Sequence, residues 1–212
     1  AGGAGNYTSA IAAGGDQYSG TSESWNGSSW TNITSSPNTG HTQQGAGSDN
    51  EDALIFGGSP YATNNQTDYW NGSSWTELAN LNTARQVGAG SGKAYTAALA
   101  IGGVNPSPDS LAIVESYNGS SWTEVGDLNT ARFGAAASGT TSAGLAFGGQ
   151  SSTAVVGLTE SWDGTSWTET ADMSTARENT AGSLSASNPA TLVFGGGDGP
   201  PFSDATEEFT IS

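Results

Sequence analysis

A seven-residue pattern recurs four times in this chain of 212 residues. It reads Trp-Asn-Gly-Ser-Ser-Trp-Thr at 25–31 and at 70–76, and it returns with small changes at 117–123 and 162–168. Asn-Gly and Asp-Gly are strong hairpin signals, because these residues adopt positive φ at little cost. Each copy therefore predicts a tight turn between two β-strands, with an aromatic residue on either side of the turn.

Two further patterns repeat at nearly the same interval. Glycine pairs that follow an apolar run stand at 14–15, 57–58, 102–103, 148–149 and 195–196. An aromatic column consists of Trp25, Trp70, Tyr117, Trp162 and Phe209. Internal repeats of about 40 to 50 residues indicate a propeller or a solenoid.

The segments inside one repeat decide between these two architectures. In residues 86–132, a run of small residues comes first, and the apolar segment 95–103 follows and ends in glycines. The segment 111–117 is rich in β-branched and aromatic residues, and 122–128 alternates between apolar and polar residues. These are signals for four short strands, without the period of a helix. Four antiparallel strands per repeat form one blade of a β-propeller.

Each full repeat also carries an ordered set of residues. In one repeat the set is an apolar strand ending in Gly102 and Gly103, then Glu115 two residues before Tyr117, then Trp122, and Arg132 last. This set resembles the kelch repeat, and the resemblance covers essentially the whole chain. It implies a β-propeller but no particular function, because propellers have many activities. The recurring Asn-Gly-Ser-Ser-Trp-Thr-Glu and Asn-Thr-Ala-Arg segments are also similar to propeller modules of marine phage virion proteins.

The number of strand signals predicts the number of blades. The first three strands of a blade occur five times, whereas the fourth, which begins at the second tryptophan of the hairpin, occurs four times. We therefore expect an all-β, five-bladed β-propeller with kelch-like four-stranded blades and a last blade of three strands. The predicted repeats of this single domain, 1–212, are approximately 1–41, 42–85, 86–132, 133–177 and 178–212.

The side chains in each strand suggest how the blades pack. The first strands are almost free of bulky residues, which suits a narrow five-bladed ring. Two apolar columns of the second strands are expected to pack between blades: Ile11, Leu54, Leu99, Leu145 and Leu192, and Ala13, Phe56, Ile101, Phe147 and Phe194. The outer edge of the last blade would stay unpaired, which is a liability for a β-sheet. We expect another segment or a neighbouring subunit to pair with Glu207, Glu208, Phe209, Thr210 and Ile211.

The composition excludes several classes of partner and site. The chain has 20 acidic residues against four Lys and Arg, so its net charge is −16. Nucleic acids require clustered cations, so we expect no nucleic-acid partner. An anionic membrane would repel the chain, and no apolar run reaches the length of a membrane-spanning helix. The absence of cysteine excludes disulfides and thiolate metal sites.

One face of the propeller is the candidate binding surface. It carries the connections between second and third strands, and these differ from repeat to repeat, as binding loops on a fixed scaffold do. Tyr18 and Tyr61 lie in these connections. Arg85, Arg132 and Arg177 are expected at the same face, with His41 at the matching place of the first repeat but one residue further from its tryptophan. They could bind a carboxylate or an acidic sugar.

Packing between blades is the alternative role of these arginines. An acidic column, Glu23, Asp68, Glu115, Glu160 and Glu207, repeats with the same period. Ion pairs from blade to blade would explain both columns, since a residue fixed by its repeat position usually serves repeat packing.

The sequence predicts no enzyme and no cofactor. A kelch-type radical-copper oxidase needs a cysteine, and the single histidine offers no Ser-His-Asp arrangement. Three arginines in three separate repeats do not suit a sialidase. The oxygen-rich segments 48–52 and 196–204 could hold calcium, but neither has EF-hand spacing, and solvated acidic loops are the favoured interpretation of both.

Two functions are consistent with these observations. The first is a non-enzymatic binding module, displayed outside the cell or on a virion, that recognises glycan or a surface protein through the variable-loop face. The alternative is a structural or decoration propeller of a larger assembly, such as a phage capsid or tail, which docks through its incomplete last blade.

Overall fold

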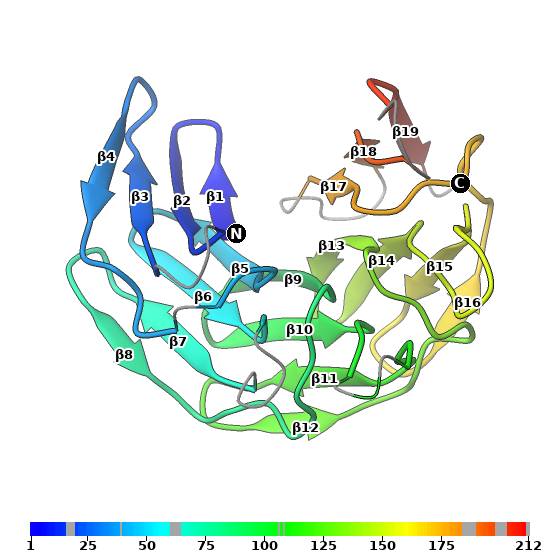
Figure 1. The fold of residues 1–212 in the computed structure, drawn as a ribbon, viewed down its shortest axis with the longest axis horizontal. Helices are drawn as coiled ribbons and strands as arrows, with labels where there is room; N and C mark the ends of the chain where they lie inside the picture. Colours follow the sequence, from blue (N-terminus) through cyan, green and yellow to red (C-terminus); the bar gives the residue numbers. More distant parts are fainter. Residues whose placement is uncertain are drawn as a thin grey trace.

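The computed structural model describes residues 1–15, 20–38, 40–59, 65–105, 107, 109–183, 190–197 and 203–210. In these residues the protein is a five-bladed β-propeller, with four blades of four antiparallel strands and a last blade of three (Figure 1). No helix among the described residues is long and apolar enough to cross a membrane. The predicted fold class and strand count are therefore confirmed.

Each blade is built from consecutive antiparallel strands, which follow one another in order from the centre of the ring outward. Blade 1 contains β1 (Gly2–Asn6), β2 (Ser9–Ala13), β3 (Ser22–Trp25) and β4 (Trp30–Ile33), and blade 2 contains β5 (Gln44–Asp49), β6 (Asp52–Phe56), β7 (Thr67–Trp70) and β8 (Trp75–Glu77). Blade 3 contains β9 (Ala89–Ala94), β10 (Ala97–Ile101), β11 (Val114–Tyr117) and β12 (Trp122–Glu124). Blade 4 contains β13 (Ala136–Thr140), β14 (Ala143–Phe147), β15 (Thr159–Trp162) and β16 (Trp167–Glu169), and blade 5 contains β17 (Ala181–Gly182), β18 (Ala190–Phe194) and β19 (Thr206–Thr210).

The repeated heptapeptide forms the hairpin between the third and fourth strands. In blade 2, Trp70 pairs with Trp75, and the ring centroids of the two are 5.3 Å apart. The side chain of Asn71 accepts hydrogen bonds from the backbone N–H groups of Ser73 and Ser74, and Gly72 has a φ of 87°. The turn requires Asn or Asp for this local cap and Gly for the positive φ, which explains why the chain repeats these letters.

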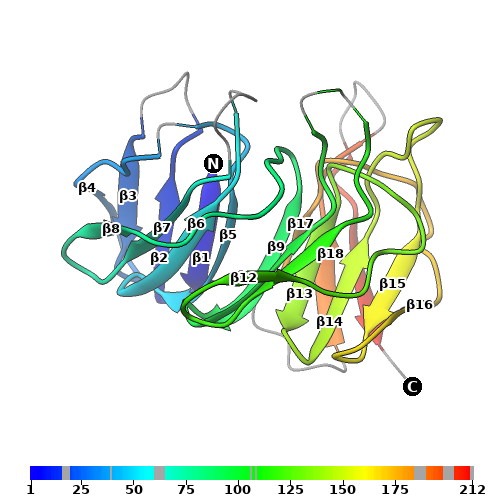
Figure 2. The same ribbon diagram turned by 90° about the horizontal axis from the view of Figure 1, so that it is seen from below.

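The innermost strands β1, β5, β9, β13 and β17 lie side by side around a central channel (Figures 1 and 2). Their backbones approach closely because glycines occupy the contacts. A Cβ atom on Gly45 would lie 2.2 Å from the carbonyl oxygen of Gly3, and one on Gly90 would lie 2.4 Å from that of Gly45. The expected lack of bulk at the axis is therefore a steric requirement of the ring.

Each of blades 1 to 4 packs one face, its forward face, on the back face of the following blade. Leu54 and Phe56 of blade 2 pack against Ala98, Ala100 and Trp122 of blade 3. Fully burying an apolar side chain of this size stabilises the fold by about 1.5–3 kcal/mol. The expected packing of the two apolar columns holds for blades 1 to 4.

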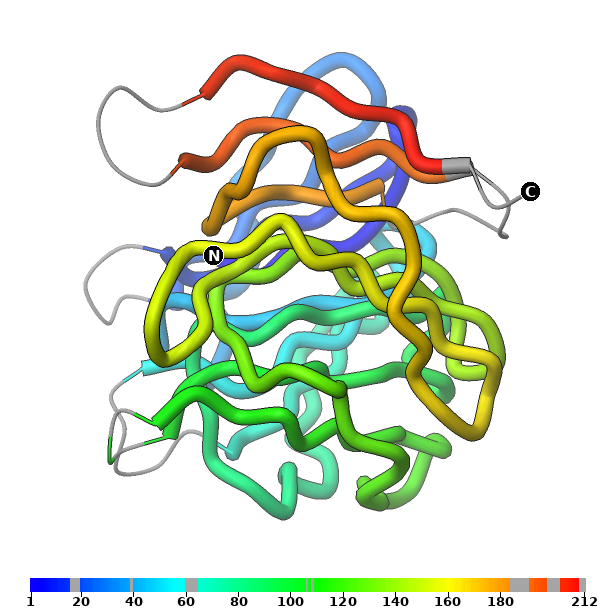
Figure 3. The backbone as a smooth tube through the Cα atoms, turned by 90° about the vertical axis from the view of Figure 1, so that its right-hand side faces the viewer, coloured from blue at the N-terminus to red at the C-terminus, as the bar shows by residue number. Residues whose placement is uncertain are grey.

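The last blade departs from this expectation. Leu192 and Phe194 are each 43% exposed, whereas Leu54, Phe56, Leu99 and Ile101 are at most 1% exposed. The prediction that Leu192 and Phe194 pack between blades is wrong for this structure, because blade 1 does not cover the forward face of blade 5. Figure 3 shows the last blade, orange to red, at the edge of the stack beside blade 4.

Candidate functional site

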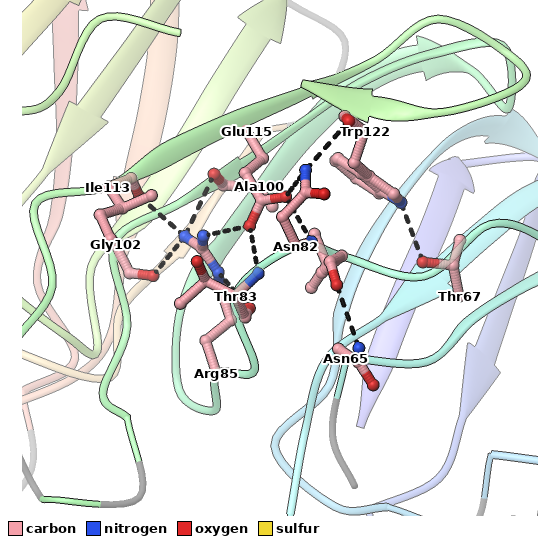
Figure 4. Close-up of polar contacts among 11 residues, drawn as sticks. Asn65, Thr67, Asn82, Thr83, Arg85, Ala100, Gly102, Ile113, Glu115 and Trp122 are labelled. Atoms are coloured by element: carbon pink, nitrogen blue, oxygen red, sulfur yellow. Dashed lines mark hydrogen bonds and ion pairs between the residues drawn. The ribbon is translucent and has the colours of Figure 1, made fainter. Parts of the chain in front are cut away.

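The three arginines form buried ion pairs between consecutive blades. Arg85 follows the last strand of blade 2, and its Nη2 lies 2.6 Å from Oε1 of Glu115 in blade 3, with both side chains 0% exposed (Figure 4). Arg85 Nη1 also donates to the carbonyl oxygens of Ile113, at 2.7 Å, and Gly102, at 3.0 Å. Arg85 thereby links the loop that follows blade 2 to the second and third strands of blade 3.

The carboxylate of Glu115 is also held by the loop that precedes Arg85. Glu115 Oε2 accepts hydrogen bonds from the backbone N–H and the side-chain amide of Asn82, and Oε1 accepts one from the backbone N–H of Thr83 (Figure 4). This arrangement explains the repeated Asn-Thr-Ala-Arg segment. Its Asn, Thr and Arg residues each donate to one glutamate of the next blade.

The same pair recurs twice with decreasing burial. Arg132 Nη2 lies 3.1 Å from Glu160 Oε1, and Arg177 Nη2 lies 2.5 Å from Glu207 Oε1. The glutamate side chains are 1% and 24% exposed, respectively. Burial lowers the pKa of the guanidinium groups of Arg85 and Arg132, and the facing carboxylates oppose this change.

Burial leaves the arginine column little contact with solvent. The side chains of Arg85, Arg132 and Arg177 are at most 1% exposed. The expected ion pairing from blade to blade is confirmed for these three residues. A ligand could reach their charges only if neighbouring blades separated.

His41 does not occupy the position in the first repeat that corresponds to the arginines. Its isolated bridge to Ser59 corresponds to the bridges of Gln86 with Val104 and of Phe133 with Gln150. The register therefore aligns His41 with Gln86 and aligns Gly40 with Arg85. The expected match of His41 with the arginine column is wrong by one residue, because the blades keep the ten-residue spacing from the fourth-strand tryptophan, and His41 lies eleven residues after Trp30.

Asp68 is consequently a buried acid without an arginine. It is 1% exposed, and its Oδ2 accepts hydrogen bonds from the backbone N–H of Asn38, at 3.1 Å, and the hydroxyl of Ser36, at 3.4 Å. The side-chain amide of Asn38 donates to the carbonyl of Gly57, which corresponds to Gly102 in the arginine-containing blade. Burial is the largest influence and raises the pKa of Asp68 to about 6, against the hydrogen bond from Asn38.

We expect Asp68 to make the stability of the propeller depend on pH. The folded protein binds a proton at Asp68 below about pH 6, whereas the unfolded chain binds it only near 3.8. The free energy of unfolding should therefore fall as pH rises from about 4 to about 6. Asp68→Asn should remove this slope and stabilise the protein at pH 7 by at most about 3 kcal/mol. Urea unfolding followed by tryptophan fluorescence from pH 4 to 7.5 measures both effects.

Asp109→Asn, which changes an exposed carboxylate, is the matched control for this experiment. Equal pH slopes for the parent protein and Asp68→Asn would contradict the assignment to Asp68.

A second candidate site is the mouth of the central channel. Thr42, Val87, Gly134 and Asn179 stand at the same position in blades 2 to 5, and their φ angles are 61°, 52°, 64° and 54°. The backbone N–H of Val87 donates to the carbonyl of Thr42, Gly134 donates to Val87, and Asn179 donates to Gly134. We call these four residues the rim. Positive φ is a strained conformation for β-branched residues such as Thr and Val.

The rim surrounds a cavity of about 420 Å³ at the end of the channel. Gln43 and Thr180 also line this cavity. The Gln43 Oε1 and Thr180 Oγ1 atoms are buried and have no hydrogen-bond partner within the described part of the chain. The mouth lies at the end of the ring that carries the variable loops, because Gln44 at the start of β5 pairs with Phe56 at the end of β6. The site therefore combines a backbone ring with one unpaired hydroxyl, that of Thr180, because the Gln43 carboxamide donates to the carbonyl of Asn38 and lies over Gly14.

The sequence reasoning missed the rim. Its column contains Gly134 and Asn179, the two residue types that adopt positive φ most readily, and this was an available signal. The column as a whole does not predict positive φ, because it also contains Thr42 and Val87, and neither residue favours positive φ.

The remaining predicted site residues divide into two groups. Tyr18, Tyr61 and Ile211 lie outside the described residues. Glu207, Glu208 and Phe209 lie on β19, which is the last strand of its sheet. The described residues contain no group of three His, Asp or Glu side chains that could hold a metal ion, and most of the segment 196–204 is not described.

Comparison of the sequence with protein families and with curated proteins gives no indication of function. No protein-family model matches the chain, and no curated protein matches it at a significant level.

Proposed function

We propose that this propeller is a non-enzymatic binding module that recognises glycan at the mouth of its central channel. The observation that carries the proposal is the clustering of strain. The three described non-glycine residues with positive φ, Thr42, Val87 and Asn179, all belong to the rim of one cavity. Strained backbone often gathers at binding sites, where it holds groups in the geometry that a ligand requires.

The chemistry of the mouth favours a neutral, hydroxyl-rich ligand. Thr180 lines the cavity, and its enclosed hydroxyl has no hydrogen-bond partner within the described residues, so after a rotation of its side chain it can accept a hydrogen bond from a sugar hydroxyl. The carboxamide of Gln43 turns away from the channel, since its Nε2 donates to the carbonyl of Asn38. The three arginines are buried in ion pairs, and the net charge of −16 opposes an anionic ligand. The cavity volume of about 420 Å³ is within the ordinary range for small-molecule sites. Neutral glycan is thus a better candidate than the acidic sugar considered from the arginine column.

The place of action proposed for this module is the outside of a cell or the surface of a virion. The resemblance of the repeats to propeller modules of marine phage virion proteins supports this setting. The excess of acidic residues supports it as well, since such a surface keeps a protein soluble in a salty medium.

Thr180→Val tests the proposal because it separates binding from folding. Replacing an unpaired buried hydroxyl by a methyl group should leave the melting temperature unchanged or raise it slightly. If Thr180 Oγ1 accepts a bond from a sugar, glycan affinity should fall by about five- to tenfold, as loss of one hydrogen bond costs about 1 kcal/mol or more. A glycan array followed by titration calorimetry on the strongest ligand measures the affinity.

Thr96→Val, at an exposed site on the opposite end of the ring, is the matched control and should bind as the parent does. Asn179→Gly is a second probe, because glycine keeps the positive φ while the carboxamide is removed. Absence of glycan binding from a folded sample, or binding that both Thr180→Val and Asn179→Gly retain in full, would refute the proposal for the channel mouth.

A further inference from the structure

An unfilled surface lies between blade 5 and blade 1. Blade 5 exposes Leu192 and Phe194 there, at positions that are buried in the forward faces of the other blades. Blade 1 exposes Glu23 and Trp30, whereas Glu115 and Trp122, at the same positions of blade 3, are at most 5% exposed. We call the surface formed by Glu23, Trp30, Leu192, Phe194 and the outer edge of β19 the seam. Its residues occupy the positions that, in the four interfaces between consecutive blades elsewhere in the ring, are in contact across a closed interface.

Among the described residues, no fourth strand pairs with the outer edge of β19, whereas each of the other four blades has one. In blade 3, Trp122, Thr123 and Glu124 pair with Tyr117, Ser116 and Glu115. The corresponding residues of β19 are Phe209, Glu208 and Glu207, and no described strand pairs with them on that side. An added strand in the same register would therefore place a tryptophan opposite Phe209.

Blade 4 offers a place for the side chain of that tryptophan. Trp122 packs on Phe56 of the preceding blade, with ring centroids 4.9 Å apart, and its Nε1 donates to Thr67 Oγ1 at 3.0 Å. Phe147 and Thr159 occupy the matching positions of blade 4 and line a hollow together with Phe209. Thr159 is 0% exposed, and its Oγ1 has no hydrogen-bond partner within the described residues. A buried hydroxyl without a partner thus stands where an indole N–H would be satisfied.

Blade 1 offers a place for an arginine. Glu23 belongs to the acidic column, but all three arginines of the chain are paired with other glutamates. In blades 2 to 4 the arginine follows the fourth-strand tryptophan by ten residues, as in Trp75 and Arg85. The tryptophan contacts the preceding blade and the arginine reaches the following one. One segment of this kind would span the seam from blade 4 to blade 1.

We propose that the seam binds one extended peptide segment of a partner polypeptide, with a tryptophan at its start and an arginine ten residues later. The segment adds a fourth strand to β19, inserts its tryptophan beside Phe147 and Thr159, and pairs its arginine with Glu23. The pattern of the occupant is that of Trp122–Arg132 in this chain. A second copy is not the donor, since Trp75–Arg85, Trp122–Arg132 and Trp167–Arg177 are engaged in their own blades. This inference is independent of the proposed glycan site.

The test uses a fluorescein-labelled peptide with the sequence of Trp122–Arg132 and the whole purified chain. Fluorescence anisotropy should show saturable binding, and a scrambled peptide should not bind. Changing the peptide's arginine to glutamine should lower the affinity about tenfold on the parent protein and leave it nearly unchanged on Glu23→Gln. Thr159→Val should leave the melting temperature unchanged and lower the affinity for the parent peptide. It should not change the affinity for a peptide whose tryptophan is replaced by alanine.

Three outcomes would overturn the proposal. The first is a folded protein, verified by circular dichroism, that gives no saturable binding or binds the scrambled peptide equally. The second is peptide binding with the same arginine dependence on Glu23→Gln as on the parent protein. The third is a concentration-dependent dimer in sedimentation that Leu192→Glu abolishes and the peptide does not dissociate, which would make a second copy the occupant. None of these outcomes depends on glycan binding at the channel mouth.

Discussion

Arg85→Met should destabilise the propeller by about 3–5 kcal/mol, because it leaves a buried carboxylate without its cation. Both side chains of the Arg85–Glu115 pair are 0% exposed, and Arg85 also satisfies the carbonyl oxygens of Ile113 and Gly102. Methionine fills much of the same volume, so the loss would reflect charge and hydrogen bonding more than a cavity. Urea unfolding at pH 7 measures the change.

Two further variants assign this effect to the ion pair. Arg85→Met combined with Glu115→Gln should recover part of the lost stability, since the buried charge is removed as well. Arg177→Met should cost less than Arg85→Met, because Glu207 is 24% exposed and water can solvate its carboxylate. If the free energy of unfolding of Arg85→Met lies within about 1 kcal/mol of that of the parent protein, the pair contributes as little to stability as a surface ion pair.

Gly45→Ala should destabilise the protein by about 3 kcal/mol or more, at the upper end of the cost of overpacking. The new Cβ would lie 2.2 Å from the carbonyl oxygen and 2.8 Å from the amide nitrogen of Gly3 on the neighbouring inner strand. Backbone atoms cannot rotate away as a flexible side chain can, so β1 and β5 would have to separate. The φ of Gly45 is not positive, so the effect tests the approach of the strands alone.

Gly3→Ala is the matched control on the adjacent strand. Its Cβ would meet a single atom within 4 Å, the carbonyl oxygen of Ile11 at 3.3 Å, and we expect a cost within about 1 kcal/mol. Thermal unfolding of the two variants compares them under one condition. Equal costs for Gly45→Ala and Gly3→Ala would mean that the inner strands do not approach as closely as the structure shows.

Much of the fold could be predicted because its signals are local and repeated. The Asn-Gly turn of residues 71–72 specifies a hairpin through contacts within four residues. The period of the glycine pairs and aromatics then sets the number of blades, and the absence of a fifth fourth-strand tryptophan predicts the three strands of the last blade. These features need no knowledge of how one blade sits on another.

The candidate sites were less predictable because they depend on contacts between blades. The residue types at Arg85 and Glu115 suggested ion pairing, but the complete burial of the pair follows from the stacking of blades 2 and 3. The acid at Asp68 looks like the other members of its column, although the ten-residue spacing from Trp30 already leads to Gly40 and not to an arginine. That Asn38 and Ser36 take over the hydrogen bonds to Asp68 is a property of the folded loop.

The sequence by itself determined the all-β class, the hairpins, the five blades and the alternation of apolar residues along each strand. These follow from turn chemistry and side-chain period, which act over a few residues. Only the tertiary structure decided that the arginines are buried, that Thr42 and Val87 adopt positive φ at the channel mouth, and that Leu192 and Phe194 are exposed at the seam. The physical reason is that each of these properties depends on a neighbouring blade, whose contacts come from residues about 30 to 45 positions away in the chain.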